Sequence, residues 1–316
     1  MILEVKNLSV TYRRQDGAHI TAVNSVDLSL DRGEVLGLVG ESGCGKSTLG
    51  KAIMGIVPAA SGTISFKDNL VEPLGRGSRP EPLRALQLIF QDPYSSLNPR
   101  RKIGDQLIDG LINQGENEKS ARQYSAQLLE RVGLSASALE KYTHQFSGGQ
   151  RQRIAIARAL SVKPEVIIAD EPISALDASA QAQVSNLLLE LTKEFNLGLI
   201  FISHDLSVVR QITDRTAVMY FGEIVEIGDT DVIWNSPAHP YTKALIEAVP
   251  KPDGRGSLPV ELSGDVPDPR FPPTGCRFNP RCKFRIDKCT SEAPQLFSIN
   301  KSQTVSCFLS STSKND

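Results

Sequence analysis

One stretch, VGESGCGKST at residues 39–48, constrains the fold of this 316-residue chain more than any other. It follows the apolar run VLGLV and precedes KSTLGKAIMGIV, whose apolar residues recur at helical spacing. A buried strand, a glycine-rich loop and a helix are therefore expected in that order. A tight turn that merely contains a lysine is the alternative, but the flanking strand and helix stand where a phosphate loop requires them. The sequence therefore predicts a nucleotide-binding loop in an α/β fold.

The loop itself, Gly40 to Ser47, fits the pattern G-x-x-x-x-G-K-[ST]. In this pattern backbone N–H groups surround the phosphates, Lys46 reaches the β and γ phosphates, and Ser47 binds Mg²⁺. Glycines permit the wrap because a Cβ would obstruct it. The residues expected to contact the nucleotide are Gly40, Ser42, Gly43, Cys44, Gly45, Lys46, Ser47 and Thr48.

A second motif, VIIADE at residues 166–171, is an apolar run that ends in two carboxylates. Acidic residues end many buried strands for solubility, so the motif is weak alone. Beside a phosphate loop it predicts that Asp170 lies near the magnesium ion and that Glu171 lies near the water that attacks the γ phosphate.

Hydrophobic patterning places these motifs within a larger organisation. The segments ILEVKNLSVTY and TAVNSVDLSL alternate with period two, whereas ALQLIF, PEVIIAD and LGLIFIS are short apolar runs typical of buried strands. Residues 91 to about 164 are mostly helical in pattern, which predicts a helical insertion within an α/β core. From about residue 250 proline and glycine are frequent, which predicts a linker and a turn-rich tail rather than a continuation of the core. We therefore expect one domain over residues 1–250 and an extension over 251–316.

The charge balance gives little reason to expect a nucleic acid or an anionic lipid as the main partner. Lysine and arginine number 35 against 36 aspartates and glutamates, so the net charge is −1. The N-terminus lacks the pattern of a signal peptide, and the apolar runs are shorter than the roughly 20 residues of a membrane span. The sequence predicts a cytosolic or peripheral chain with one nucleotide site.

Four of the five cysteines fall in the last 41 residues. Cys276, Cys282, Cys289 and Cys307 are separated by five, six and seventeen residues. Four thiolates suit an iron–sulfur cluster or a tetrahedral zinc ion, although the spacing lacks the C-x-x-C pairs of common zinc folds. Thiols that bind no metal are the third possibility.

The stretch FSGGQRQR at residues 146–153 distinguishes this chain from other proteins with a phosphate loop. Ser147, Gly148, Gly149 and Gln150 begin a predicted helix, where N–H groups form an anion-binding surface; a simple helix cap is the other interpretation. The stretch resembles the signature sequence of the ATP-binding cassette (ABC) superfamily. The resemblance implies a RecA-like core with an antiparallel β subdomain and a helical subdomain at about 91–164.

The same resemblance gives roles to residues that would be unremarkable in isolation. Gln91 matches the glutamine that touches magnesium and water and relays to the membrane subunit. Asp177 matches the aspartate that links two active sites across a dimer, and His204 matches the switch histidine that contacts the γ phosphate. Tyr12 is the candidate for stacking on adenine, although the insertion RRQDGAHI increases its distance from Gly40 along the chain.

The resemblance is closest to the ATP-binding subunits of bacterial dipeptide, oligopeptide and nickel importers, through QDPYSSLNPR, HPYTKAL and the cysteine tail. It implies ATP, Mg²⁺ and, as in some relatives, a [4Fe–4S] cluster. It also implies a second cassette, identical or related, two permease subunits, an extracytoplasmic substrate-binding protein, and a peripheral place on the cytoplasmic face of the membrane. The loop carrying Pro93, Tyr94 and Asn98 would receive a permease helix. The residues do not identify the transported substrate.

The sequence disfavours two other functions. A soluble cassette ATPase of DNA repair or translation predicts two cassettes, an inserted coiled coil or zinc site, or a basic surface, and the sequence has none of these. An ATP sensor with little hydrolysis predicts replacement of Glu171 or His204, and both are intact.

Overall fold

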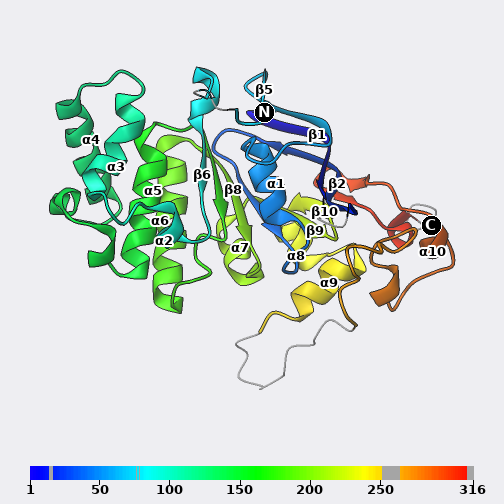
Figure 1. Cartoon of the computed structure of the whole chain (residues 1–316). Helices are drawn as coiled ribbons and strands as arrows, with labels where there is room; N and C mark the ends of the chain where they lie inside the picture. The colour runs from blue at the N-terminus through cyan, green and yellow to red at the C-terminus, as the bar shows by residue number, and fades with distance from the viewer. Residues whose placement is uncertain (14–16, 76, 78, 251–263, 312–316) are drawn as a thin grey trace.

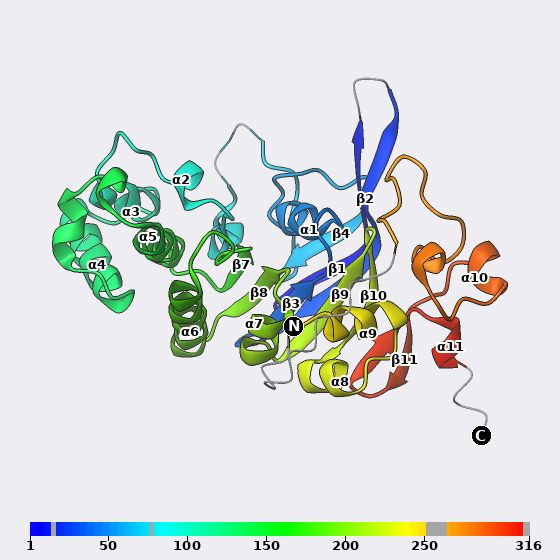
Figure 2. The same ribbon diagram turned by 90° about the horizontal axis from the view of Figure 1, so that it is seen from below.

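The computed structural model describes residues 1–13, 17–75, 77, 79–250 and 264–311. Within them, helices lie between and beside two β-sheets (Figure 1, Figure 2). The strands are β1 Leu3–Arg13, β2 His19–Leu30, β3 Val35–Val39, β4 Ser61–Phe66, β5 Asn69–Leu70, β6 Leu86–Ile89, β7 Val166–Asp170, β8 Gly198–Ser203, β9 Arg215–Tyr220, β10 Glu223–Asp229, β11 Phe297–Asn300 and β12 Gln303–Val305. The helices are α1 Lys46–Ile53, α2 Pro93–Ser96, α3 Ile103–Ile112, α4 Glu118–Arg131, α5 Gly148–Ser161, α6 Ala178–Phe195, α7 Leu206–Ile212, α8 Thr230–Asn235, α9 Pro240–Glu247, α10 Lys288–Ser291 and α11 Phe308–Ser311.

The larger sheet has the strand order β11-β12-β10-β9-β3-β8-β7-β6. From β9 to β6 its neighbours are parallel, and the remaining pairs are antiparallel. All five residues of β3 are buried. Val35 and Val39 belong to the core on one face and Leu36 and Leu38 to the core on the other. A strand covered on both faces explains why VLGLV is continuously apolar.

The smaller sheet, of order β2-β1-β4-β5, is antiparallel. Helix α1 lies between the two sheets in Figure 2. Leu49 and Ile53 of α1 share one buried cluster with Val5 and Leu8 of β1. The alternating N-terminal segments thus form the predicted antiparallel layer, and α1 carries the phosphate loop into the interface between the layers.

The helical insertion follows β6 and returns to the sheet at β7. Helices α2 to α5 form a group at one end of the molecule, with α6 beside it (Figure 1). Ile103 and Leu107 of α3, Leu128 of α4 and Ile154 of α5 are buried together, and their spacing explains the helical pattern. This segment matches the predicted insertion.

The C-terminal extension differs from the expected tail, because its last strands continue the larger sheet. Strand β12 pairs antiparallel with β10, for example Val305 with Glu226, and β11 pairs with β12. The buried carboxylate of Glu226 accepts hydrogen bonds from Gln303 Nε2 at 2.7 Å and from the backbone N–H of His239 at 3.0 Å. Strands of three and four residues are too short to produce a clear alternating pattern. The predicted linker falls largely in residues 251–263, outside the described residues.

None of the helices that the structure describes combines the length and the apolar character required to cross a bilayer.

Candidate ATP site

The predicted phosphate loop connects β3 to α1, as expected. Gly45, at the N-terminus of α1, has φ of +110°, and a Cβ there would lie 2.2 Å from the carbonyl oxygen of Ala22. Only glycine fits this turn because L side chains disfavour positive φ and the neighbouring backbone leaves no room. The loop is thereby packed against β2 of the smaller sheet.

Lys46 is the central cation of the loop and is only 4% exposed. Its Nζ donates hydrogen bonds of 2.8 Å to the carbonyl oxygens of Gly40 and Glu41, and lies 3.8 Å from Cys44 Sγ. The loop's own carbonyls therefore hold the ammonium group beside the backbone that would bind phosphate.

Ser47 and Asp170, the predicted magnesium ligands, are brought into contact by the sheet. Ser47 Oγ donates to Asp170 Oδ1 at 2.7 Å. Strand β8 separates β3 from β7, and the contact joins the first turn of α1, which follows β3, to the carboxyl end of β7. Burial raises the pKa of Asp170, and the hydrogen bond from Ser47 partly opposes this shift. A hydroxyl beside a buried carboxylate is an oxygen donor set that suits Mg²⁺.

The three residues predicted to be catalytic also converge. Glu171 Oε2 accepts a hydrogen bond from Gln91 Nε2 at 3.1 Å and lies 3.3 Å from His204 Nδ1. Glu171 directly follows β7 and has φ of +45°, a conformation uncommon for a residue with a side chain. The turn is fixed by a 3.0 Å hydrogen bond from the Glu171 N–H to the Ile202 carbonyl of β8. It directs the carboxylate toward Gln91 and His204.

These groups line a cavity of about 400 Å³. Its lining residues are Ala22, Ser42, Gly43, Gly45, Lys46, Ser47, Thr48, Gln91, Glu171 and His204. Tyr12, the predicted adenine-stacking residue, is 41% exposed on β1, and its hydroxyl lies 3.4 Å from Thr48 Oγ1. Cys44 is in the loop but is buried, so its side chain is part of the core behind the cavity. Burial raises the pKa of its thiol.

The signature residues line a different cavity, of about 420 Å³. Ser147 caps α5: its Oγ accepts from Gln150 N at 3.3 Å, while Gln150 Oε1 accepts from Ser147 N at 3.0 Å. Gly148, Gly149 and Asp177 line the same cavity, and Asp177 caps α6 through a 2.9 Å bond from Ala180 N. The lining residues of this cavity and of the phosphate-loop cavity do not overlap. One chain thus presents the phosphate loop and the signature separately.

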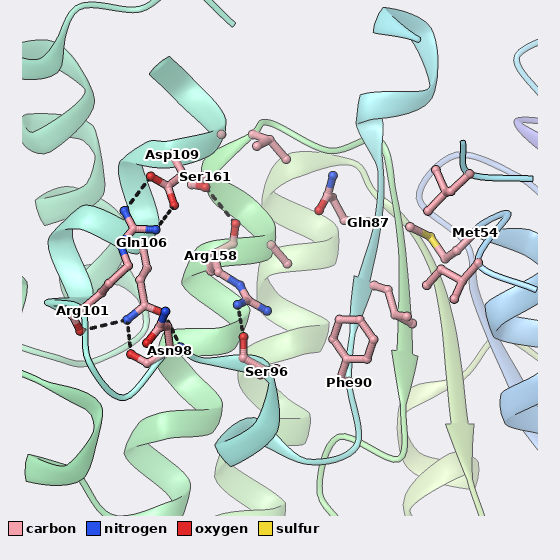
Figure 3. Close-up of a pocket in the computed structure, with 16 residues that line it drawn as sticks. Met54, Gln87, Phe90, Ser96, Asn98, Arg101, Gln106, Asp109, Arg158 and Ser161 are labelled. Atoms are coloured by element: carbon pink, nitrogen blue, oxygen red, sulfur yellow. Dashed lines mark hydrogen bonds and ion pairs between the residues drawn. The ribbon is translucent and has the colours of Figure 1, made fainter. Parts of the chain in front are cut away.

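A third cavity, of about 430 Å³, separates β6 and the segment that follows α1 from the helical insertion (Figure 3). Met54, Gln87 and Phe90 lie on one side, and Arg101 and Gln106 lie on the other; Ile56 also lines the cavity. We call this cavity the subdomain groove. Gln106 fixes the loop that follows Gln91, because it donates to the Asn98 carbonyl at 3.0 Å and accepts from the Asn98 N–H at 2.8 Å.

Of the three residues expected to receive the permease, Asn98 lines the subdomain groove, and the other two lie outside it. Pro93 is buried, and Tyr94 lies at the signature cavity with the Arg151 guanidinium 4.0 Å above its ring.

The four C-terminal thiols lie in one part of the extension. The Cys276 N–H donates to the Cys289 carbonyl at 2.9 Å. Burial raises the pKa of Cys276 to about 11; a hydrogen bond from the Phe278 backbone partly opposes the shift, and the nearby thiols of Cys289, Cys307 and Cys282 add to it. Among the described residues, no group of three or more histidine, cysteine, aspartate or glutamate side chains is arranged to hold a metal ion.

A phosphate loop facing an acidic strand end, with a serine–glycine helix start in a separate cavity, defines a nucleotide-binding cassette. The chain belongs to the ABC transporter family: the family described as ABC transporter matches residues 23–174. The family described as Oligopeptide/dipeptide transporter, C-terminal region, matches residues 225–289. These matches confirm the predicted family and the predicted branch.

Similar proteins support the same assignment. The chain is 46% identical to the dipeptide transport ATP-binding protein DppF of Haemophilus influenzae, over 92% of this chain and 89% of that protein. It is 42% identical to the di/tripeptide transport ATP-binding protein DppF of Pseudomonas aeruginosa, over 97% of both. A solved dimer of the ATP-binding cassette MJ0796, in a post-hydrolysis state bound to ADP and Pi, superposes with a TM-score of 0.64. It is 26% identical and covers 72% of this chain and 99% of its own. The fold class is confirmed, and the DNA repair or translation alternative gains no support.

Sequence reasoning missed some residues of the site. Ala22 of β2 contributes to the cavity through the close packing of its backbone against Gly45. Tyr241 and Arg281 contact the loop residue Glu41 from segments about 200 and 240 residues further along the chain. No local pattern signals such contacts, because they depend on how distant segments pack.

Proposed function

We propose that this chain is the ATP-binding and ATP-hydrolysing subunit of a peptide importer, a translocase in which hydrolysis drives transport through a membrane permease. One observation carries the proposal. Glu171 contacts both Gln91 and His204 at the cavity of the phosphate loop, and Ser47 meets Asp170 at the same edge of the sheet. These are the parts required to hold a triphosphate, bind its metal ion and activate water.

Each residue has a definite task in this proposal. Backbone N–H groups of the loop, with Lys46, hold the phosphates, while Glu171 accepts a proton from the attacking water. Gln91 and His204 orient that carboxylate and the γ phosphate. Ser47, Asp170 and Gln91 would hold Mg²⁺, which when bound neutralises charge that develops on the phosphates. Tyr12 would stack on adenine.

A complete site requires two cassettes. The signature residues Ser147, Gly148, Gly149 and Gln150 line a cavity that shares no lining residue with the phosphate-loop cavity of their own chain. We infer that they close on the ATP of a partner cassette, identical or related, and that Asp177 links the two sites. The dimeric cassette MJ0796, bound to ADP and Pi, supports this arrangement. Since ATP binds best to the closed pair, binding favours closure and hydrolysis favours opening.

The subdomain groove is the proposed contact with the permease. The loop that follows Gln91 and the helical insertion both line this groove. A permease helix bound there would therefore respond to a movement of Gln91. Two permease subunits and an extracytoplasmic substrate-binding protein would complete the importer, at the cytoplasmic face of the membrane. Peptides are the favoured substrate because both relatives described above are named for dipeptide or di/tripeptide transport. Nickel is the alternative substrate.

For the extension we propose a [4Fe–4S] cluster on Cys276, Cys282, Cys289 and Cys307, with zinc as the alternative. Zinc requires all sulfurs about 2.3 Å from one point. A cluster takes one thiolate per iron and leaves its ligands farther apart. Its role would be structural or regulatory, because hydrolysis requires no electron transfer. Metal analysis and absorption spectra of anaerobically purified protein decide between iron with sulfide, zinc, and neither.

Purification in mild detergent tests the proposal as a whole. The chain should co-purify with a permease and a second cassette, and reconstituted vesicles should hydrolyse ATP faster when a peptide-loaded binding protein is added. Glu171→Gln in the same vesicles separates coupled hydrolysis from contaminating ATPase. Stimulation by a nickel-loaded but not a peptide-loaded binding protein would replace peptide with metal as the substrate. A chain recovered without membrane partners would contradict the proposal.

A further inference from the structure

The second residue of the phosphate loop, Glu41, is held on three sides. Its backbone N–H donates to the Tyr241 hydroxyl at 2.9 Å, and its carbonyl accepts from Lys46 Nζ at 2.8 Å. Its carboxylate receives two hydrogen bonds from Arg281, of 2.6 Å from Nη1 and 3.0 Å from Nη2. Glu41 does not line the ATP cavity. These contacts therefore act on the shape of the loop rather than on the nucleotide.

Arg281 belongs to the C-terminal extension, and its side chain is only 3% exposed. It ends a single turn of 3₁₀-helix, Asn279–Arg281, between Cys276 and Cys282. Asn279 fixes this turn by donating 2.8 Å hydrogen bonds to the carbonyls of Thr274 and Cys276. These hydrogen bonds hold the turn from which the guanidinium group of Arg281 reaches the phosphate loop.

An aromatic cluster seats the same turn against the core. The ring of Phe278 packs edge-on against Tyr220 with centroids 5.2 Å apart, and lies 5.4 Å from Tyr241. Tyr241 is also the residue that binds the Glu41 N–H. Two neighbouring contacts, one aromatic and one ionic, therefore join the extension to the back of the phosphate loop.

A bidentate arginine–carboxylate pair is strongly directional. The Arg281 side chain is buried and that of Glu41 is 23% exposed, so removal of the carboxylate would leave a buried guanidinium group without this anion. The loop binds phosphate through backbone N–H groups, whose directions depend on the conformation of Gly40–Ser47. Fixing both the backbone and the side chain of Glu41 restricts that conformation before the nucleotide arrives. Preorganisation of this kind increases affinity because less ordering remains to be done on binding.

We propose that Arg281 is a positioning residue of the ATP site, through which the cysteine-bearing extension orders the phosphate loop by way of Glu41. The inference rests on the proposed function, because it takes ATP as the ligand of the loop. It assigns the extension a part in nucleotide affinity, separate from any group that its cysteines bind.

The test uses the purified full-length chain and a fluorescent ATP analogue. Arg281→Gln and Glu41→Gln should each raise the Kd by roughly tenfold or more, and the double variant should be no weaker than either single variant. Arg277→Gln is the matched control. Arg277 joins the same extension to Glu223 of β10 at 3.3 Å and does not reach the loop, so its Kd should stay within about twofold of the wild type.

Kinetics separate positioning from general destabilisation. In ATPase assays Arg281→Gln should raise KM for ATP about tenfold while kcat stays within about threefold. Unchanged Kd in a folded Arg281→Gln variant would overturn the proposal, as would equal weakening by Arg277→Gln. If Arg281→Gln does not fold, the exchanged pair Glu41→Arg with Arg281→Glu decides the matter. Restored affinity supports the proposal, and a folded but weakly binding double variant overturns it. Wild-type protein that fails to bind ATP would instead contradict the proposed function.

Discussion

Gln91 and Glu171 lie 80 residues apart in the chain and meet through a 3.1 Å hydrogen bond from Nε2 to Oε2. The contact links the loop beside the subdomain groove to the carboxylate that we assign as the base. A permease helix that moves Gln91 would therefore change the surroundings of Glu171 directly.

Replacing Glu171 should separate binding from hydrolysis. We expect Glu171→Gln to bind ATP with near wild-type affinity and to lose about 100-fold or more of kcat, because the amide cannot accept the proton. The variant should also accumulate as an ATP-bound dimer, visible by size-exclusion chromatography. Glu190→Gln, on the exposed side of α6, is the control. Rapid turnover by Glu171→Gln would remove Glu171 from its assigned role.

Replacing Asp170 should have opposite effects on stability and on metal response. Burial raises the pKa of Asp170, so its charged form costs the folded state free energy once the pH exceeds that pKa. We expect Asp170→Asn to raise the Tm of the metal-free protein at neutral pH by roughly 1–3 °C.

The same variant should lose the additional Tm increase that Mg²⁺ gives the ADP-bound wild type. The metal-free Tm difference should shrink as the pH falls through the raised pKa, where the wild-type carboxyl becomes neutral. A Tm difference that grows in acid would contradict this reasoning.

A charge in the signature should block closure of the dimer but not loading of the monomer. A Cβ on Gly149 would meet Ala180 Cβ at 3.6 Å, an ordinary contact, so the fold should accept a side chain there. Gly149→Asp should leave the ATP affinity of the isolated chain within about twofold and reduce ATPase activity by about 100-fold, because the carboxylate would face a phosphate. Gly149→Ala adds a methyl group without a charge, and therefore distinguishes the effect of side-chain volume from that of the carboxylate. Full activity of Gly149→Asp would disprove the shared site.

Cys44 should react slowly with alkylating agents at neutral pH. Burial raises the pKa of its thiol, and the thiolate is the reactive form. Below that pKa the rate should rise roughly tenfold per pH unit, and bound ATP should slow it further. Peptide mass spectrometry measures the modification at residue 44, and Cys44→Ser is the control that lacks this thiol. Modification at pH 7 as fast as that of free cysteine would show that the thiol is accessible.

A charge in the subdomain groove should impair association with the permease. Ile56 lines the groove and is 42% exposed, whereas Leu70 is 60% exposed on β5 and lies outside it. Ile56→Asp should reduce co-purification with the permease by about tenfold, because the charge would lose water on docking. Leu70→Asp should not. ATP binding by either variant monitors folding, and equal recovery of both would place the contact elsewhere.

The sequence indicated most of the site because its signals are local. The phosphate loop, the carboxylates that end β7 and the capping residues Ser147 and Asp177 act through backbone preferences over a few residues. The place of β12 was not predictable in the same way. Three residues give no period, and pairing with β10 depends on an edge that forms only when the sheet is assembled.

The sequence by itself determined which chemical groups are present and which short segments would be loop, cap or buried strand, because steric and hydrogen-bonding preferences act within a few residues. The tertiary structure decided which groups meet. Strand order brings Ser47 to Asp170, and packing of the extension brings Arg281 to Glu41 across 240 residues. These contacts depend on sheet register and on the sum of many burial energies, which no single segment encodes.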